Sequence, residues 1–584
     1  MPLEQDKFNG WKLKLREEIP TGLFPELFAH SIPLWKVGQN IQFTHVGVEK
    51  LPGWTVLKDP GNGEPIRGLM QNVETSGAAA IIYAGDLTQL YRYDVTNDSL
   101  ETLGTGYNLS EDSGYSEWDS GSTTWDSGTT LWDEGIIKAS HWSIINYGDY
   151  VLATSGADNP QIKTDTGVFT DMADSINLVT IASGGTGYTL GDTLTLTGGA
   201  GTGATIEVTQ VGGSGEIEAV KITAGGSGWT TAGSSGFTGG TGSGGSISGT
   251  CMDLYTTGIS TVQIWVKRGP HILGFSTNVS DKEFIWCDAD DPFTWATGPD
   301  NLAGQLQIRE LKGPIRAAVP LGEYIAVYGD DQMFLVNYLA NDLVFGYSPV
   351  LDGVGAVSKK AVVAIDRLNY GLSQQGFFRT DGASFEYIDE PAIREWFDNN
   401  SASAQLGKAI AFHDEENTQV RWYLPTTSSA ITGGVSFNYK TNTWSIIESA
   451  KSAGQERIIL GGPITGGEDG ILYREVSGLN DGVSAMTSWV RSKPLDWSNA
   501  DIVKELDSIR IGFTGTGLQY RIGWSEEENG TINWGSYTDM DQGFPFHNLR
   551  TAGRWLHFEI YSATTNADWL VASVEFIGRM EGTR

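Results

Sequence analysis

Short runs of residues that alternate between apolar and polar, separated by turn-forming residues, recur along most of this chain of 584 residues. A period of two is the pattern of β-strands, whose side chains point alternately to the two faces of a sheet. Many short strands with little helix predict an all-β fold: a sandwich, a barrel or a propeller. The clearest predicted strands are Ala78–Tyr83, Leu90–Val95, Thr261–Val266, Tyr324–Tyr328, Val362–Ile365 and Val420–Leu424.

One stretch has the period of a helix. Asp389 is a candidate cap for it, and Pro391 suits the first turn. Ile393, Trp396 and Phe397 then share one face. The sequence therefore predicts a single short helix within a chain of strands.

Two distant segments resemble each other, Tyr93–Leu103 and Phe437–Ile447. Each has an aromatic residue, Asp or Asn, a polar turn and then a large apolar residue that opens a return strand. Phe377–Tyr387 is a shorter relative with Asp381 and Gly382 as its turn. We interpret the three as the strand–turn–strand unit that closes a propeller blade, since propeller repeats can be this degenerate. The alternative is that any protein rich in β-hairpins yields such pairs.

A second repeat is sharper. Nine residues from Ile181 match nine from Ile222 at an offset of 41, and the aromatic residue falls at the same place, Tyr188 in one and Trp229 in the other. Clean strand patterns lie between them. We therefore predict that residues 176–250 are a small Gly-rich β module inserted into the main fold.

Glycine is abundant at two places in this module. Residues 233–249 are rich in Gly, Ser and Thr, which predicts a flexible linker back to the main fold. Gly199–Gly203 invites comparison with phosphate-binding loops, but a strand pattern follows it and no Gly-Lys-Ser/Thr does. A turn between strands is the favoured interpretation.

The charge balance is strongly acidic, with 38 Lys and Arg against 71 Asp and Glu and a net charge of −33. Such a surface speaks against binding nucleic acid or membranes through basic patches. Two cysteines, Cys251 and Cys287, build neither a Cys-rich zinc site nor a disulfide framework. The N-terminus has no apolar signal core, and no stretch is long and apolar enough to span a membrane. We expect synthesis and folding in a cytoplasm, without cofactor or metal.

Carboxylates form two clusters, Asp288–Asp291 and Gly329–Asp331. Either offers a pair for acid–base work on a glycan, which needs two carboxyl groups about 5 to 9.5 Å apart. Acidic turns in an acidic protein are the favoured interpretation. The seven His are scattered without metal-ligand spacing, and no nucleophile elbow is found. We predict no catalytic residues and hence no enzyme.

Trp118, Trp125 and Trp132 recur every seven residues, each followed by Asp. Gly, Ser and Thr around them disfavour a helix, so three short strand–turn units are expected. Exposed Trp with carboxylates suits sugars, a cation or a partner protein; the alternative is local packing or a subunit interface. Together with Tyr188 and Trp229, they are the candidate partner-docking residues.

Five segments resemble motifs of phage tail structural proteins. Gly38–Trp54 is similar to an N-terminal strand motif that ends in Glu-Lys-x-Pro-Gly, and Trp286–Trp295 to an Asp-Pro…Trp blade segment. Gly376–Gly382, Trp555–Ile560 and Val574–Gly578 fit the same group. Their order along the chain resembles the tail nozzle, or tail tubular hub, of short-tailed bacteriophages, over residues 36–110 and 260–584.

This resemblance implies a virion protein of the tail, with a β-propeller core, a β-sandwich-like platform and the inserted module. It implies a homohexamer that binds a tail adaptor and tail fibres, and whose ring delivers the genome at ejection without gripping the DNA. The alternative is a glycan-binding or glycan-cleaving tail or surface protein. The expected division is 1–75 for an N-terminal arm and first platform strands, 76–175 for the first part of the propeller with the Trp-Asp loop, 176–250 for the insert, 251–460 for the rest of the propeller and 461–584 for a C-terminal β platform.

Overall fold

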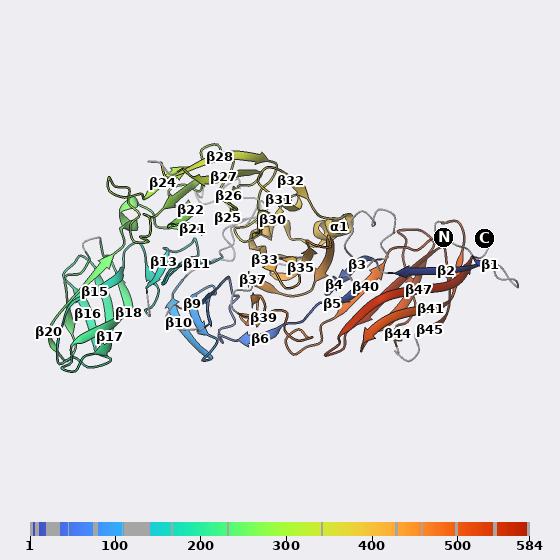
Figure 1. The fold of residues 1–584 in the computed structure, drawn as a ribbon, viewed down its shortest axis with the longest axis horizontal. Helices are drawn as coiled ribbons and strands as arrows, with labels where there is room; N and C mark the ends of the chain where they lie inside the picture. The colour runs from blue at the N-terminus through green and yellow to red at the C-terminus, as the bar shows by residue number, and fades with distance from the viewer. Residues whose placement is uncertain are drawn as a thin grey trace, which may run out of the picture.

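A computed structural model shows that the chain is nearly all β, as predicted. The structure describes residues 4–5, 11–18, 35–44, 46–73, 80–107, 109, 141–164, 167–230, 233–339, 343–426, 430–456, 460–496, 500–540 and 546–580. Each of the six strands predicted from alternation overlaps a strand of the structure. Figure 1 shows an elongated molecule with both termini at one end.

Seven antiparallel units of four strands make up the middle of the molecule. The first four contain β7 (Gly68–Val73), β8 (Ala80–Gly85), β9 (Gln89–Asp94) and β10 (Ser99–Thr105); β11 (Ser143–Tyr147), β12 (Tyr150–Thr154), β13 (Gln161–Thr164) and β14 (Thr170–Asp171); β21 (Val262–Arg268), β22 (His271–Thr277), β23 (Glu283–Trp286) and β24 (Gly304–Gln307); and β25 (Ala317–Leu321), β26 (Tyr324–Tyr328), β27 (Gln332–Tyr338) and β28 (Phe345–Asp352).

The last three contain β29 (Val362–Ile365), β30 (Leu368–Ser373), β31 (Gly376–Thr380) and β32 (Phe385–Tyr387); β33 (Ile410–Asp414), β34 (Gln419–Pro425), β35 (Ile431–Asn438) and β36 (Thr443–Ile447); and β37 (Lys451–Gln455), β38 (Ile464–Gly467), β39 (Leu472–Arg474) and β6 (Thr55–Lys58). We call these the seven-sheet unit.

The first strands of successive sheets contact one another in a circle: β7 meets β11, then β21, β25, β29, β33 and β37 follow, and β37 returns to β7. No sheet among the described strands closes on itself. The contact of β37 with β7 closes the circle, and the seventh sheet is completed by β6, which comes from the N-terminal region and pairs with β39 as its last strand. Apolar clusters fill the spaces between neighbouring sheets.

The three similar segments found in the sequence occupy equivalent places. They are the hairpins β9–β10, β31–β32 and β35–β36, each made of the third and fourth strands of its sheet. Their turns are built alike, because a side-chain oxygen of Asp94, Asp381 or Asn438 accepts hydrogen bonds from the backbone N–H groups two and three positions on. The repeated Asp or Asn therefore has a structural cause.

One α-helix lies in the described part, α1 (Pro391–Asn400). It buries Ile393 and Phe397 as expected, with Trp396 partly buried beside them. The residue before the helix is Glu390, and no side chain caps it, so the expectation of an Asp389 cap is wrong. The carboxylate of Asp389 lies 3.7 Å from Arg394 instead. Two 3₁₀ helices, η2 (Asp253–Thr257) and η3 (Ser403–Lys408), complete the helical content of these residues.

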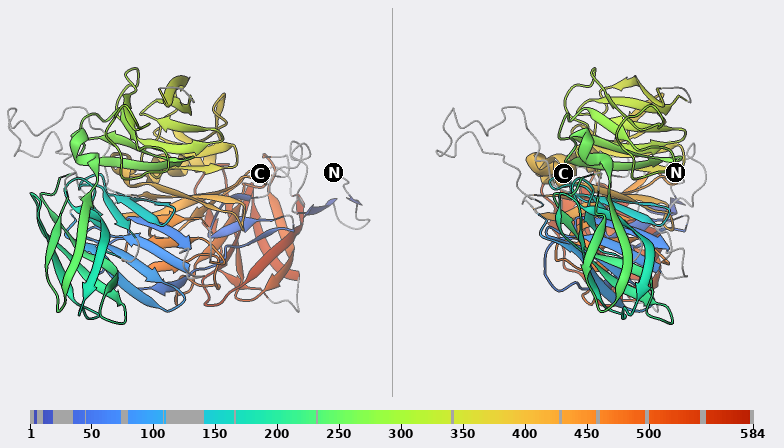
Figure 2. Two further views of the ribbon diagram at one scale, coloured as in Figure 1. Left: turned by 60° about the vertical axis from the view of Figure 1, so that its left-hand side comes forward. Right: turned by 90° about the vertical axis from the view of Figure 1, so that its left-hand side faces the viewer.

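The insert consists of β15 (Ile176–Thr186), β16 (Thr193–Thr197), β17 (Thr202–Val211), β18 (Ile217–Ser227), β19 (Gly236–Gly239) and β20 (Ser243–Cys251). Strands β15, β16 and β17 correspond to β18, β19 and β20 at an offset close to 41 residues. The strand pairs show the same symmetry. When each strand is replaced by its counterpart, the pair β15–β20 becomes the pair β18–β17, and β16 pairs with its own counterpart β19. The insert is thus an internal duplication, and it lies far from the chain ends (Figures 1 and 2).

The flexible linker expected at 233–249 is wrong, because β19 and most of β20 lie there. Glycine has a low strand propensity, but here tertiary packing requires it. A Cβ on Gly249 would lie 2.8 Å from Ile176 and 3.0 Å from Leu196. The glycines therefore allow close packing instead of a mobile connection.

The platform is built from both ends of the chain. One sheet contains β1 (Glu4–Gln5), β2 (Trp11–Glu18), β47 (Trp569–Met580), β41 (Lys504–Gly515), β45 (Phe546–Gly553), β4 (Ile41–Phe43) and β5 (Val48–Lys50). The other contains β3 (Trp35–Gln39), β40 (Ser488–Ser492), β46 (Trp555–Ser562), β42 (Gln519–Ser525), β43 (Asn533–Trp534) and β44 (Thr538–Asp539). Both contribute to one apolar core.

The platform is joined directly to the seven-sheet unit, since β3 pairs with β36 and so extends the sixth sheet to ten strands. The seventh sheet runs to Arg474 and also includes 55–58, so the boundaries expected at 75 and 460 fall inside the seven-sheet unit. No helix within the described ranges is long and apolar enough to cross a membrane.

Candidate functional site

The candidate docking residues fall into two groups. Trp118, Trp125 and Trp132 lie outside the described residues. Tyr188 and Trp229 are buried in the core of the insert, with 5% and 0% of their surfaces exposed. Side chains so buried are not available to a partner, so this assignment is corrected: they stabilise the insert.

The burial of these two aromatic residues follows from the duplication. Tyr188, from the first copy of the repeat, packs over Gly240 and Gly242 of the second, whose added Cβ atoms would lie 3.1 and 2.5 Å from its ring. Trp229 packs in the same way over Gly199 and Gly201. The two glycine pairs are 41 residues apart, so each half of the insert receives the aromatic side chain of the other.

The acidic clusters serve their own loops. Asp288 accepts hydrogen bonds from the backbone of Ala289 and Leu302, and Asp291 from that of Phe293. Asp330 pairs with Arg316 at 2.7 Å. Across the ranges the structure describes, no group of three or more His, Cys, Asp and Glu side chains is arranged to hold a metal ion. These contacts agree with the interpretation of acidic turns.

Cys251 and Cys287 are both buried thiols outside any disulfide. Burial, aided by nearby aspartates, raises the pKa of each to about 12. A thiol is nucleophilic only as the thiolate, so both are poor nucleophiles at neutral pH.

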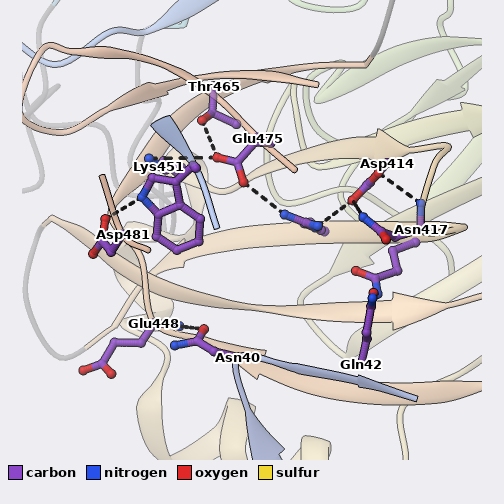
Figure 3. Close-up of polar contacts among 12 residues, drawn as sticks. Asn40, Gln42, Asp414, Asn417, Glu448, Lys451, Thr465, Glu475 and Asp481 are labelled. Atoms are coloured by element: carbon purple, nitrogen blue, oxygen red, sulfur yellow. Dashed lines mark hydrogen bonds and ion pairs between the residues drawn. The ribbon is translucent and has the colours of Figure 1, made fainter. Parts of the chain in front are cut away.

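The strongest polar constellation is a buried ion-pair network in the sixth and seventh sheets (Figure 3). Arg421 on β34 lies 2.5 Å from Asp414 and 3.1 Å from Glu475, and all three side chains are fully buried. Glu475 also accepts a 2.6 Å hydrogen bond from Thr465 and lies 3.9 Å from Lys451. A buried ion pair is tolerated only when its charges compensate one another, and here one guanidinium serves two carboxylates.

Lys451 extends this network to the N-terminal region. Its ammonium group lies 3.2 Å from the ring centre of Tyr473 and 4.9 Å from that of Trp54. Burial lowers the pKa of Lys451 to about 8, although Glu475 opposes the shift. The indole N–H of Trp54 donates a 2.5 Å hydrogen bond to Asp481. Since Trp54 immediately precedes β6, the network anchors the strand that completes the seventh sheet.

A second, partly buried lysine links parts of the seven-sheet unit that lie far apart in sequence. Lys359, just before β29, donates to the carbonyl oxygen of Ser155 at 2.9 Å and lies 3.4 Å from that of Gln263. Burial and the neighbouring Lys360 lower the pKa of Lys359 to about 7. This contact ties the fifth sheet to the loop that follows β12 in the second sheet and to β21 of the third.

These charged side chains hold strands of different sheets together. Nothing in the sequence around Arg421, Glu475 or Lys359 distinguished them from ordinary surface charges. The available signal was only their placement: Arg421 lies within a strand whose neighbours, Val420 and Trp422, are apolar. The arrangement is that of a rigid scaffold.

Comparison with known proteins adds little. No protein-family model matches the chain, and no curated protein matches it either. One solved structure that is similar to it is the computationally designed Ika8 protein, at 9% identity. The alignment covers 72% of this chain and all of that one, with a TM-score of 0.35.

Proposed function

We propose that this chain is a structural subunit of a short-tailed phage tail, the nozzle or tubular hub. In this proposal the seven-sheet unit is a seven-bladed β-propeller and the platform is a β-sandwich. Six copies form a ring that binds a tail adaptor and tail fibres and through which the genome leaves the virion. The protein is not an enzyme.

The observation that carries the proposal is the way the chain closes. The first strands of seven sheets follow one another in a circle, and β6 from the N-terminal region completes the last sheet beside β39. The ends of the chain then build one platform together. This organisation supports the architecture implied by the sequence resemblance, in which a propeller stands on a platform.

The buried ion pairs support a scaffold that keeps its shape. Removing one partner of a buried pair costs about 3–5 kcal/mol, so the seventh sheet opens only at high cost. A channel through which a genome passes needs a scaffold held closed in this way, whereas the active site of an enzyme usually needs an exposed reactive group.

The charge supports passage of DNA without binding. Each phosphate contact requires a cation, and the chain has a net charge of −33. Like-charge repulsion near a wall acts over about 8 Å at physiological ionic strength. We expect no retention of duplex DNA by the purified protein at moderate salt. Tight binding that weakens steeply with salt would contradict the conduit.

The test is the assembly itself. The purified chain, alone and with tail partners, should give a ring of six copies with an axial channel by light scattering and negative-stain imaging. A monomer in both conditions would contradict the proposal. Release of sugars from host polysaccharide by the purified protein would favour the glycan-cleaving alternative.

A further inference from the structure

One face of the platform sheet β3–β40–β46–β42–β43 carries a set of half-exposed aromatic and arginine side chains. The strand register aligns them, since Trp489 lies opposite Tyr561, and Glu559 lies opposite both Arg491 and Arg521. Alternate residues of the same strands, such as Val490, Ile560 and Ile522, point into the apolar core. The aromatic residues therefore lie on the face that turns away from the core.

These side chains stack in one continuous ladder. The guanidinium of Arg491 lies 5.1 Å from the ring centres of both Trp489 and Trp534. That of Arg521 lies 4.4 Å from Trp534 and 4.5 Å from Tyr537. The ring of Tyr537 is 4.8 Å from that of Tyr561. Rings and cations from β40, β42, β43 and β46, together with Tyr537, thus stack on one another, which holds long side chains in fixed positions.

Glu559 holds both arginines and one tyrosine of the ladder in place. Its carboxylate is buried and accepts hydrogen bonds from Arg491 at 2.5 and 2.9 Å, from Arg521 at 2.6 Å and from Tyr537 at 2.7 Å. Within the ladder, one carboxylate balances two guanidinium groups, so the ladder itself keeps an excess of positive charge. The exposed carboxylates of Glu448 and Asp539 border it, bound to Gln39 opposite Trp489 and to Gln519 opposite Tyr561.

The positive character extends to β3. Burial lowers the pKa of His557 to about 4, and the charges of Arg491 and Lys36 add to the shift. His557 is therefore neutral at pH 7. Lys36 is exposed and precedes Val37, which lies opposite Arg491 in the register of β3 and β40. Local cations outnumber the carboxylate that they contact, in a chain whose overall charge is −33.

We propose that this ladder face, defined by Lys36, Trp489, Arg491, Arg521, Trp534, Tyr537 and Tyr561, docks an acidic surface of a second copy of this chain. The proposal rests on the ring assembly proposed above and identifies the contact that builds it. Trp, Tyr and Arg are the residues that dominate the energetics of protein interfaces.

The charge argues for a second copy as the occupant. Two chains of −33 repel each other, so a local site of opposite charge favours contact between them. A cationic face meeting an acidic one is a heterologous contact, and heterologous contacts close into rings. The ladder also costs little entropy on binding, because its side chains are already ordered.

The experiment uses charge reversal at an exposed position. Lys36→Glu combined with Trp489→Ala changes one charge and one ring of the face without touching Glu559. Lys440→Glu combined with Tyr324→Ala is the matched control, since both residues are exposed and lie in the seven-sheet unit. Both double variants alter the net charge by the same amount. Molar mass is measured by light scattering over a protein dilution series.

We expect the wild type and the control to form the ring. The ladder variant should dissociate at protein concentrations at least tenfold higher than those at which the wild type and the control dissociate. Equal assembly of both variants would overturn the ladder contact and leave the ring proposal standing. A wild type that is monomeric at every concentration would overturn both.

A second variant distinguishes loss of the contact from misfolding of the double variant. Lys36→Glu alone changes only an exposed side chain, so its circular dichroism and melting temperature should equal those of wild type. Its ring should weaken by a smaller factor, and the loss should diminish as salt screens the reversed charge. Unchanged assembly of this folded variant at low salt would overturn the proposal.

Discussion

The seven-sheet unit with its insert and the platform use the same residue type differently. Among the tryptophans of the first region whose burial is described, all but Trp396 are buried; among those of the platform with described burial, Trp569 alone is. The buried set is Trp54, Trp142, Trp229, Trp265, Trp286, Trp295, Trp422 and Trp444, and the half-exposed platform set is Trp35, Trp489, Trp524, Trp534 and Trp555. A buried indole stabilises a fold, whereas a half-exposed one is available to a partner.

Charges follow the same division. Arg421 and its two carboxylates have no exposed surface, while Arg491 and Arg521 keep 31% and 20% of their side chains exposed around Glu559. The first cluster is isolated from water, so its loss is a matter of stability. The second borders solvent, so its loss should act mainly on association.

The largest expected effect comes from breaking the buried cluster. Arg421→Met leaves the carboxylates of Asp414 and Glu475 without their shared cation, at a cost of about 3–5 kcal/mol in the free energy of unfolding. Arg491→Met is the matched platform variant, and it should cost less than about 2 kcal/mol because Glu559 keeps Arg521 and Tyr537. Chemical denaturation measures both. Equal losses would remove the distinction between the two regions.

Tryptophan truncation tests the comparison without charge. Trp142 is fully buried, packs against Gly68 and Gly85 and donates a 2.7 Å hydrogen bond to the carbonyl oxygen of Asp86. Trp142→Ala should therefore cost about 3–5 kcal/mol. Trp489→Ala, at the edge of the ladder, should cost less than about 1.5 kcal/mol.

The measurement is the same denaturation curve, with the unfolding slope as a check that both variants unfold in one step. A Trp489→Ala loss as large as that of Trp142→Ala would show that the ladder is part of the platform's core, and the docking proposal would lose its main support.

Local pattern was sufficient for much of the fold. Alternation predicted strands, and the Asp or Asn of three hairpins marked the third and fourth strands of their sheets, because a short-range hydrogen bond to the next residues sets each turn. The 41-residue repeat predicted the insert, whose described strands begin at Ile176 and end at Cys251. Here composition misled. The Gly-rich stretch 233–249 predicted a flexible linker, and Tyr188 and Trp229 were predicted to dock a partner, but the glycines pack beneath these two buried rings.

Long-range pairing was not predictable. Strand β6 joins β39 from more than 400 residues away, and Glu475 reaches Arg421 across two sheets. The ladder was not predicted from the sequence for the same reason, since strand register alone brings Trp489, Trp534 and Tyr561 together. Nothing in an isolated sequence records such partners, because each residue's neighbours along the chain are ordinary.

A smaller, pH-dependent effect is expected within the seven-sheet unit. The pKa of Lys359 falls from 10.5 to about 7 on folding, so between those values the unfolded chain binds more protons and stability rises with pH. Relative to Lys359→Met, the wild type should gain about 1.5 kcal/mol between pH 7 and 8.5. Lys440→Met, at an exposed turn, should show no such trend.

Denaturation at several pH values measures this difference. A wild type that gains nothing relative to Lys359→Met above pH 7 would show that Lys359 is solvated and does not tie the sheets together.

Removing most of the insert sharpens the comparison by separating the insert from the seven-sheet unit. Leu178 and Thr250 are paired on β15 and β20, so residues 179–249 can be replaced by an Asn-Gly turn that suits a two-residue hairpin. Asn177 remains, and with it the buried hydrogen bonds to Thr170 and Asp171.

Besides the β15–β20 ladder, five hydrogen bonds between the insert and its surroundings are lost, those donated by Val168, Ser175, Gly228, Trp229 and Cys251. We therefore expect a soluble protein with the strand signal of the remaining sheets and a free energy of unfolding within about 2 kcal/mol of wild type. Asn177→Ala in the full chain should cost a similar amount or more, because it leaves buried partners of Asn177 unsatisfied. Insoluble product with a lost strand signal would instead make the insert part of the core, since the sheets around it would then depend on its packing.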